Sequence, residues 1–323
     1  MKLSSRLVAG CTGAVAALAL TFTAGGGSAG AYLPGGSATG APGSAQPSAP
    51  QSSEPAGTPT LSEQELAARL DQYQPEQGQG SSAFQGDTVG AVTPEAVGAY
   101  LAEVMASTDA YWDGYFAEIG AQEPMYFYAV VAPGQTFRSN CQEGRIGADT
   151  PNSYYCPADF YTDDQGVEYA GSVVLPLTTF ADMWAGRIFD SGADPDFKGD
   201  FAAAAIAAHE RGHEVQHELQ VQYGLPDIVQ SVNGSTVRLK EKELIADCFS
   251  GNWANYAYQQ NYLVGTDVEE AVAALDAIGD TSQQGSDPHG SPEERAEAFM
   301  LGYNTGAPYQ CMKQYWVTVD WRQ

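Results

Sequence analysis

The chain of 323 residues is poor in basic residues, because 14 Lys and Arg stand against 40 Asp and Glu and the formal net charge at pH 7 is −26. A surface with this excess of negative charge repels phosphate backbones and anionic lipid headgroups. We therefore expect no nucleic-acid partner and no stable membrane association of the mature protein. The length is sufficient for one large domain or two small ones with a buried core.

Cysteine is also scarce, with five residues in all and none in a C-x-x-C arrangement, which argues against a cysteine zinc site. Cys11 lies near the N-terminus, and the other four are Cys141, Cys156, Cys248 and Cys311. An even number of cysteines in an exported chain predicts two disulfides. Three connectivities are possible. In one of them Cys141–Cys156 closes a short loop and Cys248–Cys311 ties the C-terminus back.

A long apolar run lies at the N-terminus. Residues 1–6 form a short basic segment, residues 7–24 are mostly apolar, and Ala29-Gly30-Ala31 provides a small-x-small cleavage pattern. This arrangement is typical of a secretory signal peptide, so we predict that residues 1–31 are removed and that the mature protein is extracellular. The alternative is an uncleaved membrane anchor, for which a run with several Gly and Thr residues is marginal.

Residues 32–60 consist mainly of Gly, Ser, Pro and Ala, and residues 74–90 are again loop-like, with one short capped helix between the two stretches. Such a composition buries too little apolar surface to fold by itself. We therefore interpret residues 32–92 as a linker and residues 93–323 as one compact domain.

Within this domain, the first predicted helix begins at Thr93-Pro94 and carries apolar and aromatic residues at helical spacing as far as Ile119. Aromatic and β-branched residues predict strands at residues 125–132, 154–156 and 171–175. Capping and stop signals predict four further helices: from Asp200 as N-cap to about Gln222, from Ser235 through Trp253, from Thr266 or Asp267 to Gly279, and from Ser291 to Gly302. This order of elements predicts an α+β domain.

Histidine is rare, with only four residues, and two of them form the motif His209-Glu210-x-x-His213 after an alanine-rich run. Residues four apart share one face of a helix, so both imidazoles can bind one Zn²⁺ ion while Glu210 reaches a water at the metal. The motif also occurs by chance, and a histidine on a helix is often only a polar surface residue. His217 lies eight residues beyond His209, about 12 Å along a helix and too far for the same ion, so we interpret it as an ordinary polar residue.

A catalytic zinc site has three protein ligands and an open position for water. Glu243 and Asp247 are four residues apart on a predicted helix, so Glu243 can be the third ligand while Asp247 accepts a hydrogen bond from a ligand imidazole. Such a pair is also common on a solvated helix face. Here, however, residues 244–249 are mostly apolar, and an unpaired carboxylate in those surroundings is costly.

Several stretches resemble the bacterial putative neutral zinc metallopeptidase family over roughly residues 95–315. They are Tyr155-Cys156-Pro157-Ala158-Asp159, His209-Glu210-x-Gly212-His213-x-Val215-Gln216, Arg238-Leu239, Glu243-Leu244-x-Ala246-Asp247-Cys248-Phe249-x-Gly251-x-Trp253, Asp267 to Gly279, and His289-Gly290-Ser291-x-x-x-Arg295. The resemblance implies a zincin-like domain in which long helices carry the zinc site beside a small antiparallel or mixed sheet. It also implies one zinc ion on His209, His213 and Glu243, Glu210 as catalytic base, and the pairing Cys141–Cys156 and Cys248–Cys311.

The chain departs from the family pattern at two places. Members usually carry His where this chain has Glu214, and residues 160–170 look inserted before the strand Val173-Val174-Leu175, where Pro176 replaces a polar residue. We predict that Val173–Leu175 is an edge strand, against which an extended peptide substrate binds by strand addition.

The predicted function is that of a secreted zinc metallopeptidase, a hydrolase in which Glu210 takes a proton from water and returns it to the leaving amine. The oxyanion needs a further donor, for which His289 is the first candidate, Arg295 the second and Tyr256 the third. His289 could equally be an ordinary histidine in a surface loop. One alternative is a non-catalytic secreted protein that binds zinc or a partner, in which Glu210 would have no use. Another is a zinc amidase that acts on cell-wall amides.

Overall fold

The computed structural model describes residues 31–34, 92–122, 124–187, 199–280 and 288–321. The predicted signal peptide, apart from its last residue, and most of the predicted linker lie outside these residues. The elements in chain order are β1 (Ala31–Pro34), α2 (Pro94–Ile119), β2 (Phe127–Val131), β3 (Thr136–Phe137), β4 (Ile146–Gly147), β5 (Tyr154–Thr162), β6 (Glu168–Pro176), α3 (Leu177–Trp184), α4 (Asp200–Tyr223), β7 (Val229–Val232), β8 (Ser235–Arg238), α5 (Glu241–Gln259), α6 (Asp267–Ala277), α7 (Pro292–Thr305) and α8 (Pro308–Tyr315). This mixture of long helices and small sheets confirms the α+β class.

The main sheet has the strand order β1-β2-β6-β5, with β1, β2 and β6 parallel and β5 antiparallel to β6. The prediction that Val173–Leu175 forms an edge strand was wrong, because β6 is paired on one side with β2 and on the other with β5. Tyr154 and Tyr155 of β5 pair with Val174 and Val173, and the hairpin continues through Phe160, which pairs with Ala170, so β5 is the edge strand of the sheet.

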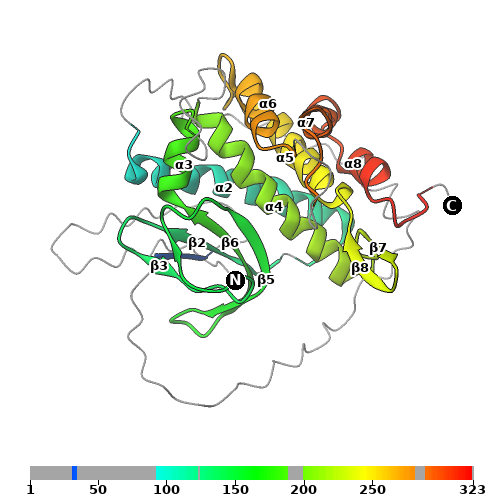
Figure 1. Cartoon of the computed structure of the whole chain (residues 1–323), viewed down its shortest axis with the longest axis horizontal. Helices are drawn as coiled ribbons and strands as arrows, with labels where there is room; N and C mark the ends of the chain where they lie inside the picture. Colours follow the sequence, from blue (N-terminus) through cyan, green and yellow to red (C-terminus); the bar gives the residue numbers. More distant parts are fainter. Residues whose placement is uncertain (1–30, 35–91, 123, 188–198, 281–287, 322–323) are drawn as a thin grey trace.

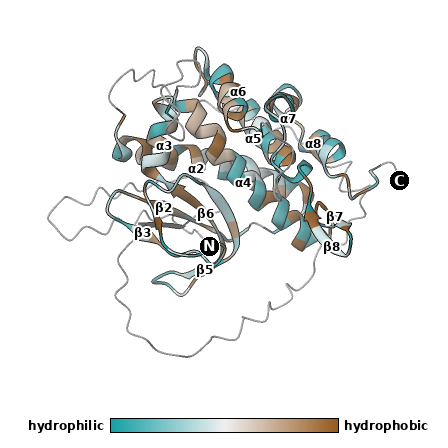
Figure 2. Cartoon of the chain, in the orientation of Figure 1, coloured by the Kyte–Doolittle hydropathy of each residue, from teal (hydrophilic) through white to brown (hydrophobic). Residues whose placement is uncertain are grey.

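Helix α4 is the central element of the helical layer. It packs against the sheet through β5 and β6, and against α2, α3, α5 and α6. In Figure 1 it runs between the sheet and the group α5 to α8. The strands β2 and β6 are mostly apolar (Figure 2), because each has helices on one face and a smaller apolar cluster around Phe127 and Tyr169 on the other. The alanines at 202–205 and 207–208 are buried, so the first half of α4 can pack closely against its neighbours on several sides.

The start of α4 differs from the prediction in its cap. The N-cap residue is Gly199, which has no side chain to accept a hydrogen bond, and Asp200 is the first helical residue. Instead, Glu270 of α6 accepts a hydrogen bond from the backbone N–H of Phe201 at 3.2 Å. A carboxylate from another helix therefore satisfies one of the free N–H groups at this helix end.

The start of α5 was also predicted wrongly. Ser235 is the first residue of β8, which pairs with β7 in a hairpin whose turn is Asn233-Gly234, both with positive φ. Asn-Gly is the typical sequence of such a two-residue turn. The helix starts only at Glu241. The capping box at Ser291 is confirmed, although α7 continues past Gly302 to Thr305.

Glycines allow α5 to lie close to its neighbouring helices. A Cβ atom on Gly212 of α4 would lie 3.0 Å from the carbonyl oxygen of Ala246, and one on Gly302 of α7 would lie 1.9 Å from that of Cys248. The predicted disulfides Cys141–Cys156 and Cys248–Cys311 are confirmed, and the second ties α5 to α8. Two disulfides indicate an oxidising compartment. Among the residues that the structure describes, no helix has the length and apolar character needed to cross a membrane.

Candidate metal centre

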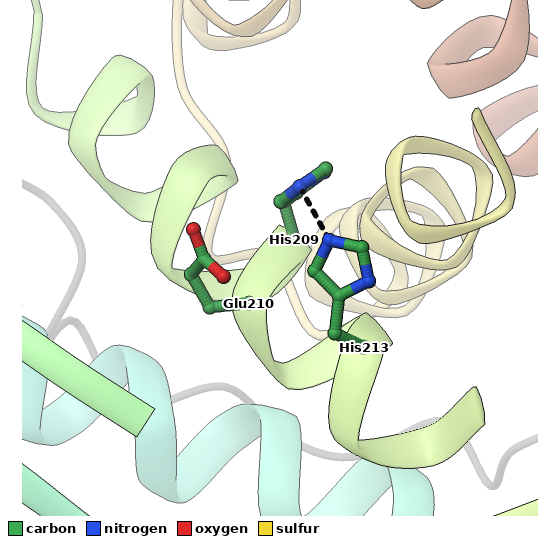
Figure 3. A group of neighbouring side chains, drawn as sticks. All are labelled: His209, Glu210 and His213. Carbon is green, nitrogen blue, oxygen red and sulfur yellow. Dashed lines mark hydrogen bonds between the residues drawn. The ribbon is translucent and has the colours of Figure 1, made fainter. Parts of the chain in front are cut away.

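The two motif histidines lie one turn apart on the same face of α4. Their Nε2 atoms are 3.1 Å apart, and Figure 3 shows the two rings facing each other at a steep angle. His209 is buried, and His213 is partly open to the cavity beside it. Helical spacing places the rings on one face, as the sequence predicted.

Glu243, in the first turn of α5, completes a triangle with the two rings. Its Oε2 atom lies 3.3 Å from His209 Nε2 and 3.2 Å from His213 Nε2. Ligand atoms about 2.0–2.1 Å from a tetrahedral zinc ion lie about 3.3 Å from one another, so the spacing of these three atoms fits that geometry and leaves the fourth corner for water. The donor set of two imidazoles and one carboxylate is also typical of catalytic zinc sites.

Asp247 contacts the ring nitrogen of His209 that faces away from Glu243. Its Oδ1 atom lies 2.7 Å from His209 Nδ1, so the ring directs Nε2 towards Glu243. Arg295 donates from Nε to Oδ2 and from a terminal N–H to Oδ1, each at 2.8 Å. Burial acts to raise the pKa of Asp247, but Arg295 and His209 hold it below its ordinary value. Asp247 is therefore a carboxylate buried with two partners, which meets the condition for burying a charge.

Glu210 is the third polar residue of the motif. It directly follows His209, so its side chain leaves the helix about 100° further round the axis. Figure 3 shows its carboxylate beside the two rings, and the ligand atoms of the three residues lie within 4.8 Å of one another. Burial raises the pKa of Glu210, and the nearby Glu243 raises it further, while His209 and His213 lower it. A buried carboxylate with a raised pKa beside this centre can accept a proton from water.

These residues line a cavity of about 450 Å³. Its walls come from α4, from the edge strand β5, from the start of α5 and from the loop before α7. His289 and Arg295, the first two candidates for the oxyanion donor, also line it, but Arg295 already binds Asp247. The His289 side chain is 46% exposed, and its Nδ1 atom lies 3.6 Å from Asp280. Tyr256 is not among the lining residues, and its ring packs against that of Tyr111.

Residues 61–313 match the family described as "Putative neutral zinc metallopeptidase". The chain belongs to this family. It is 32% identical to the uncharacterized protein YpfJ of Escherichia coli K12 over 228 residues, which are 66% of this chain and 69% of YpfJ. It is 36% identical over 132 residues to the uncharacterized proteins Mb2605 of Mycobacterium bovis and Rv2575 of Mycobacterium tuberculosis, which covers 35% of this chain and 44% of each relative. No solved structure matches the chain.

Two residues of this cavity were missed from the sequence. His217 is not simply a polar surface residue, because its Nδ1 atom lies 3.0 Å from the hydroxyl of Tyr155 and both residues line the cavity. Gly171 lets Tyr155 take this position, since a Cβ atom there would lie 2.6 Å from the hydroxyl. The contact joins α4 to the edge strand, a long-range pairing that no local pattern reveals.

Gln216 is the second missed residue. Its buried side-chain amide nitrogen lies 3.2 Å from His213 Nδ1 and 3.1 Å from the carbonyl oxygen of Lys242. The amide nitrogen carries two N–H groups, so it can contact both of these atoms at once, and the contact restricts rotation of the His213 ring. Gln216 follows His213 by three residues, so the helical period could have revealed it.

Replacing Gln216 with Leu is therefore expected to weaken zinc binding by about 10–100-fold, as other losses of such outer contacts do. Competition with a chelator of known affinity measures the change. The matched control is Gln220→Leu, one turn further along the same cavity, where the amide donates to Asp227 at 3.2 Å and not to a histidine. Equal zinc affinity of the two variants would show that Gln216 does not orient His213.

Proposed function

We propose that the chain is a secreted, zincin-like zinc metallopeptidase that hydrolyses peptide bonds. The observation that carries the proposal is the triangle of His209 Nε2, His213 Nε2 and Glu243 Oε2, with sides of 3.1–3.3 Å, beside a buried carboxylate in an open cavity. His209, His213 and Glu243 would hold one zinc ion. When bound, the ion activates a water molecule and polarises the scissile carbonyl group.

Proton transfer, orientation of the ligands and stabilisation of the oxyanion are the roles of the protein's own side chains. Glu210 accepts the proton of the attacking water and passes it to the leaving amine. Asp247 and Arg295 fix the orientation of His209, and Gln216 fixes that of His213. His289, on the cavity wall, is the proposed hydrogen-bond donor to the oxyanion. A non-catalytic zinc protein would need no carboxylate in the position of Glu210.

The substrate is a peptide or protein segment in extended conformation. The edge strand β5 lines the cavity with Tyr154, Tyr155 and Pro157, so we assign to it the substrate pairing that the sequence analysis expected at Val173–Leu175. An extended peptide can pair there by strand addition. The predicted signal sequence and the two disulfides support secretion, and the excess of acidic residues supports the absence of nucleic-acid and membrane partners.

The test is to measure zinc content and peptide cleavage together in the purified mature protein and in His213→Ala. We expect one zinc per chain and cleavage of unstructured peptides by the first, and loss of both in the second, because two ligands cannot replace three. Peptides and cell-wall amides are offered in parallel. Zinc binding without turnover of either would support the non-catalytic alternative, and turnover of cell-wall amides alone would make the protein an amidase.

A further inference from the structure

A polar contact on the wall of the cavity joins the edge strand to the helix that carries the motif histidines. Helix α4 packs against β5, which forms the edge of the main sheet (Figure 1). The hydroxyl of Tyr155 lies 3.0 Å from Nδ1 of His217, and the centres of the two rings are 5.8 Å apart. Both side chains line the cavity that contains the metal centre. A substrate bound in the cavity therefore lies beside this contact.

The direction of this hydrogen bond follows from the surroundings of the His217 ring. Its Nδ1 atom has two oxygen neighbours, the hydroxyl of Tyr155 at 3.0 Å and the carboxylate of Glu218 at 4.0 Å. A negative charge beside one ring nitrogen favours a proton on that nitrogen. The Nδ1–H group is therefore the donor, and the oxygen of Tyr155 is the acceptor. Protonation of the whole ring leaves this direction unchanged, because both ring nitrogens then donate.

The hydroxyl of Tyr155 then keeps its own hydrogen for a further acceptor. Among the described residues its only hydrogen-bond partner is His217, which already donates to it. Burial raises the pKa of Tyr155, and Glu218 raises it further, so the hydroxyl stays protonated at neutral pH. No side chain of β6 covers it at Gly171, where a Cβ atom would lie 2.6 Å from the hydroxyl oxygen. The wall of the cavity therefore presents a neutral O–H donor that is held in place.

The position of this donor relative to the metal centre matches the repeat of an extended peptide. His217 follows His213 by four residues on α4, which is about 6 Å along the helix axis. In an extended peptide, residues two apart face the same side and lie about 6.6 Å from each other. When the scissile carbonyl group lies at the metal centre, the carbonyl group two residues away therefore lies beside the hydroxyl of Tyr155. A neutral O–H donor suits this neutral acceptor.

We propose that Tyr155 is a substrate-binding residue whose hydroxyl donates a hydrogen bond to the backbone carbonyl group two residues from the scissile bond, and that His217 is the positioning residue that holds this hydroxyl. The inference rests on the proposed peptidase function and adds a substrate group to it. Because the recognised group belongs to the backbone, the side chain at that position matters little. The substrate must, however, extend at least two residues beyond the scissile bond on this side.

The test uses one quenched fluorescent peptide and two versions of it, each with a thioamide at the second residue on one side of the scissile bond. Sulfur is a weak acceptor, so a thioamide removes most of the hydrogen bond. At one of the two positions we expect kcat/KM to be about 2- to 10-fold higher for the amide, the scale of one neutral hydrogen bond. Tyr155→Phe keeps the ring and should abolish this ratio. The control Tyr161→Phe makes the same change on β5 outside the cavity lining and should keep the ratio.

His217→Asn and His217→Leu test the positioning role. Asparagine keeps an N–H donor on the atom bonded to Cγ, as in the Nδ1 of histidine, and should therefore retain the preference for the amide. Leucine has no donor and should lose most of this preference. If Tyr155→Phe and His217→Leu lowered kcat/KM equally for the amide and both thioamide peptides, the pair would be structural only and the proposal would be overturned.

Binding of the same peptides to zinc-loaded Glu210→Gln, with and without Tyr155→Phe, is followed by fluorescence anisotropy and does not require turnover. Tighter binding of the amide peptide that depends on Tyr155, without any cleavage by the wild type, would uphold the proposal and contradict the peptidase function. Cleavage by the wild type that is the same for the amide and both thioamide peptides would overturn the proposal and leave the peptidase function standing. A loss in Tyr155→Phe that is confined to kcat would place the hydroxyl at the scissile oxyanion and would also overturn it.

Discussion

Glu210→Gln is expected to lower kcat by about 10²- to 10⁴-fold while the protein still binds one zinc per chain. The amide has nearly the same size as the carboxylate but cannot accept a proton, so the change removes the base and little else. Glu210 is not needed to complete the ligand triangle, because Glu243 Oε2 already lies 3.2–3.3 Å from both imidazole Nε2 atoms. Steady-state cleavage of a peptide and zinc analysis of the same preparation measure the two properties.

The matched control for this variant is Glu118→Gln, which makes the same chemical change at an exposed position of α2. It should keep both zinc and turnover. If Glu210→Gln lost its zinc, then Glu210 would be a ligand and the assignment of Glu243 would have to be revised. Wild-type turnover with zinc bound would mean that another group accepts the proton.

The part of the site that could be predicted from the sequence is the part that depends on helical spacing. His209 and His213 on α4, and Glu243 and Asp247 on α5, are each four residues apart, so each pair had to share a face wherever its helix lies. Apolar neighbours of the second pair then indicated that its carboxylates were buried with partners. The observed contacts of Asp247 with His209 and Arg295 agree with that reasoning.

The parts that failed depend on how distant segments pair. Val173–Leu175 has a sequence suited to an edge or an interior strand equally, and its place follows from its pairing with β2 on one side and with Tyr154 and Tyr155 of β5 on the other. Likewise, the contact between Tyr155 and His217 joins residues 62 positions apart. The prediction that a helix starts at Ser235 failed for a different reason. The Asn233-Gly234 turn, which excludes a helix cap at Ser235, was visible in the sequence.

Glu214→Ala is expected to reduce the free energy of unfolding by about 3–5 kcal/mol, the usual cost of leaving a buried charge without its partner. The structure gives Glu214 a partner. Its carboxylate forms an ion pair with Arg211, and both side chains are fully buried. The Arg211 guanidinium also lies 3.5 Å from Asp109 of α2 and 4.4 Å from the ring centre of Tyr126. The variant would leave this cation with the more distant carboxylate of Asp109 and the ring of Tyr126.

Denaturant unfolding of the zinc-free protein measures the loss, since bound metal would add its own stabilisation. The triple variant Asp109→Asn, Arg211→Met and Glu214→Leu removes the cation together with both carboxylates that pair with it. It should therefore lose less than Glu214→Ala, because paired buried charges can be replaced by apolar side chains at little cost. If the triple variant were the less stable of the two, the charged cluster would itself be strongly stabilising. A loss below about 1 kcal/mol for Glu214→Ala would show that Asp109 alone is sufficient to neutralise Arg211.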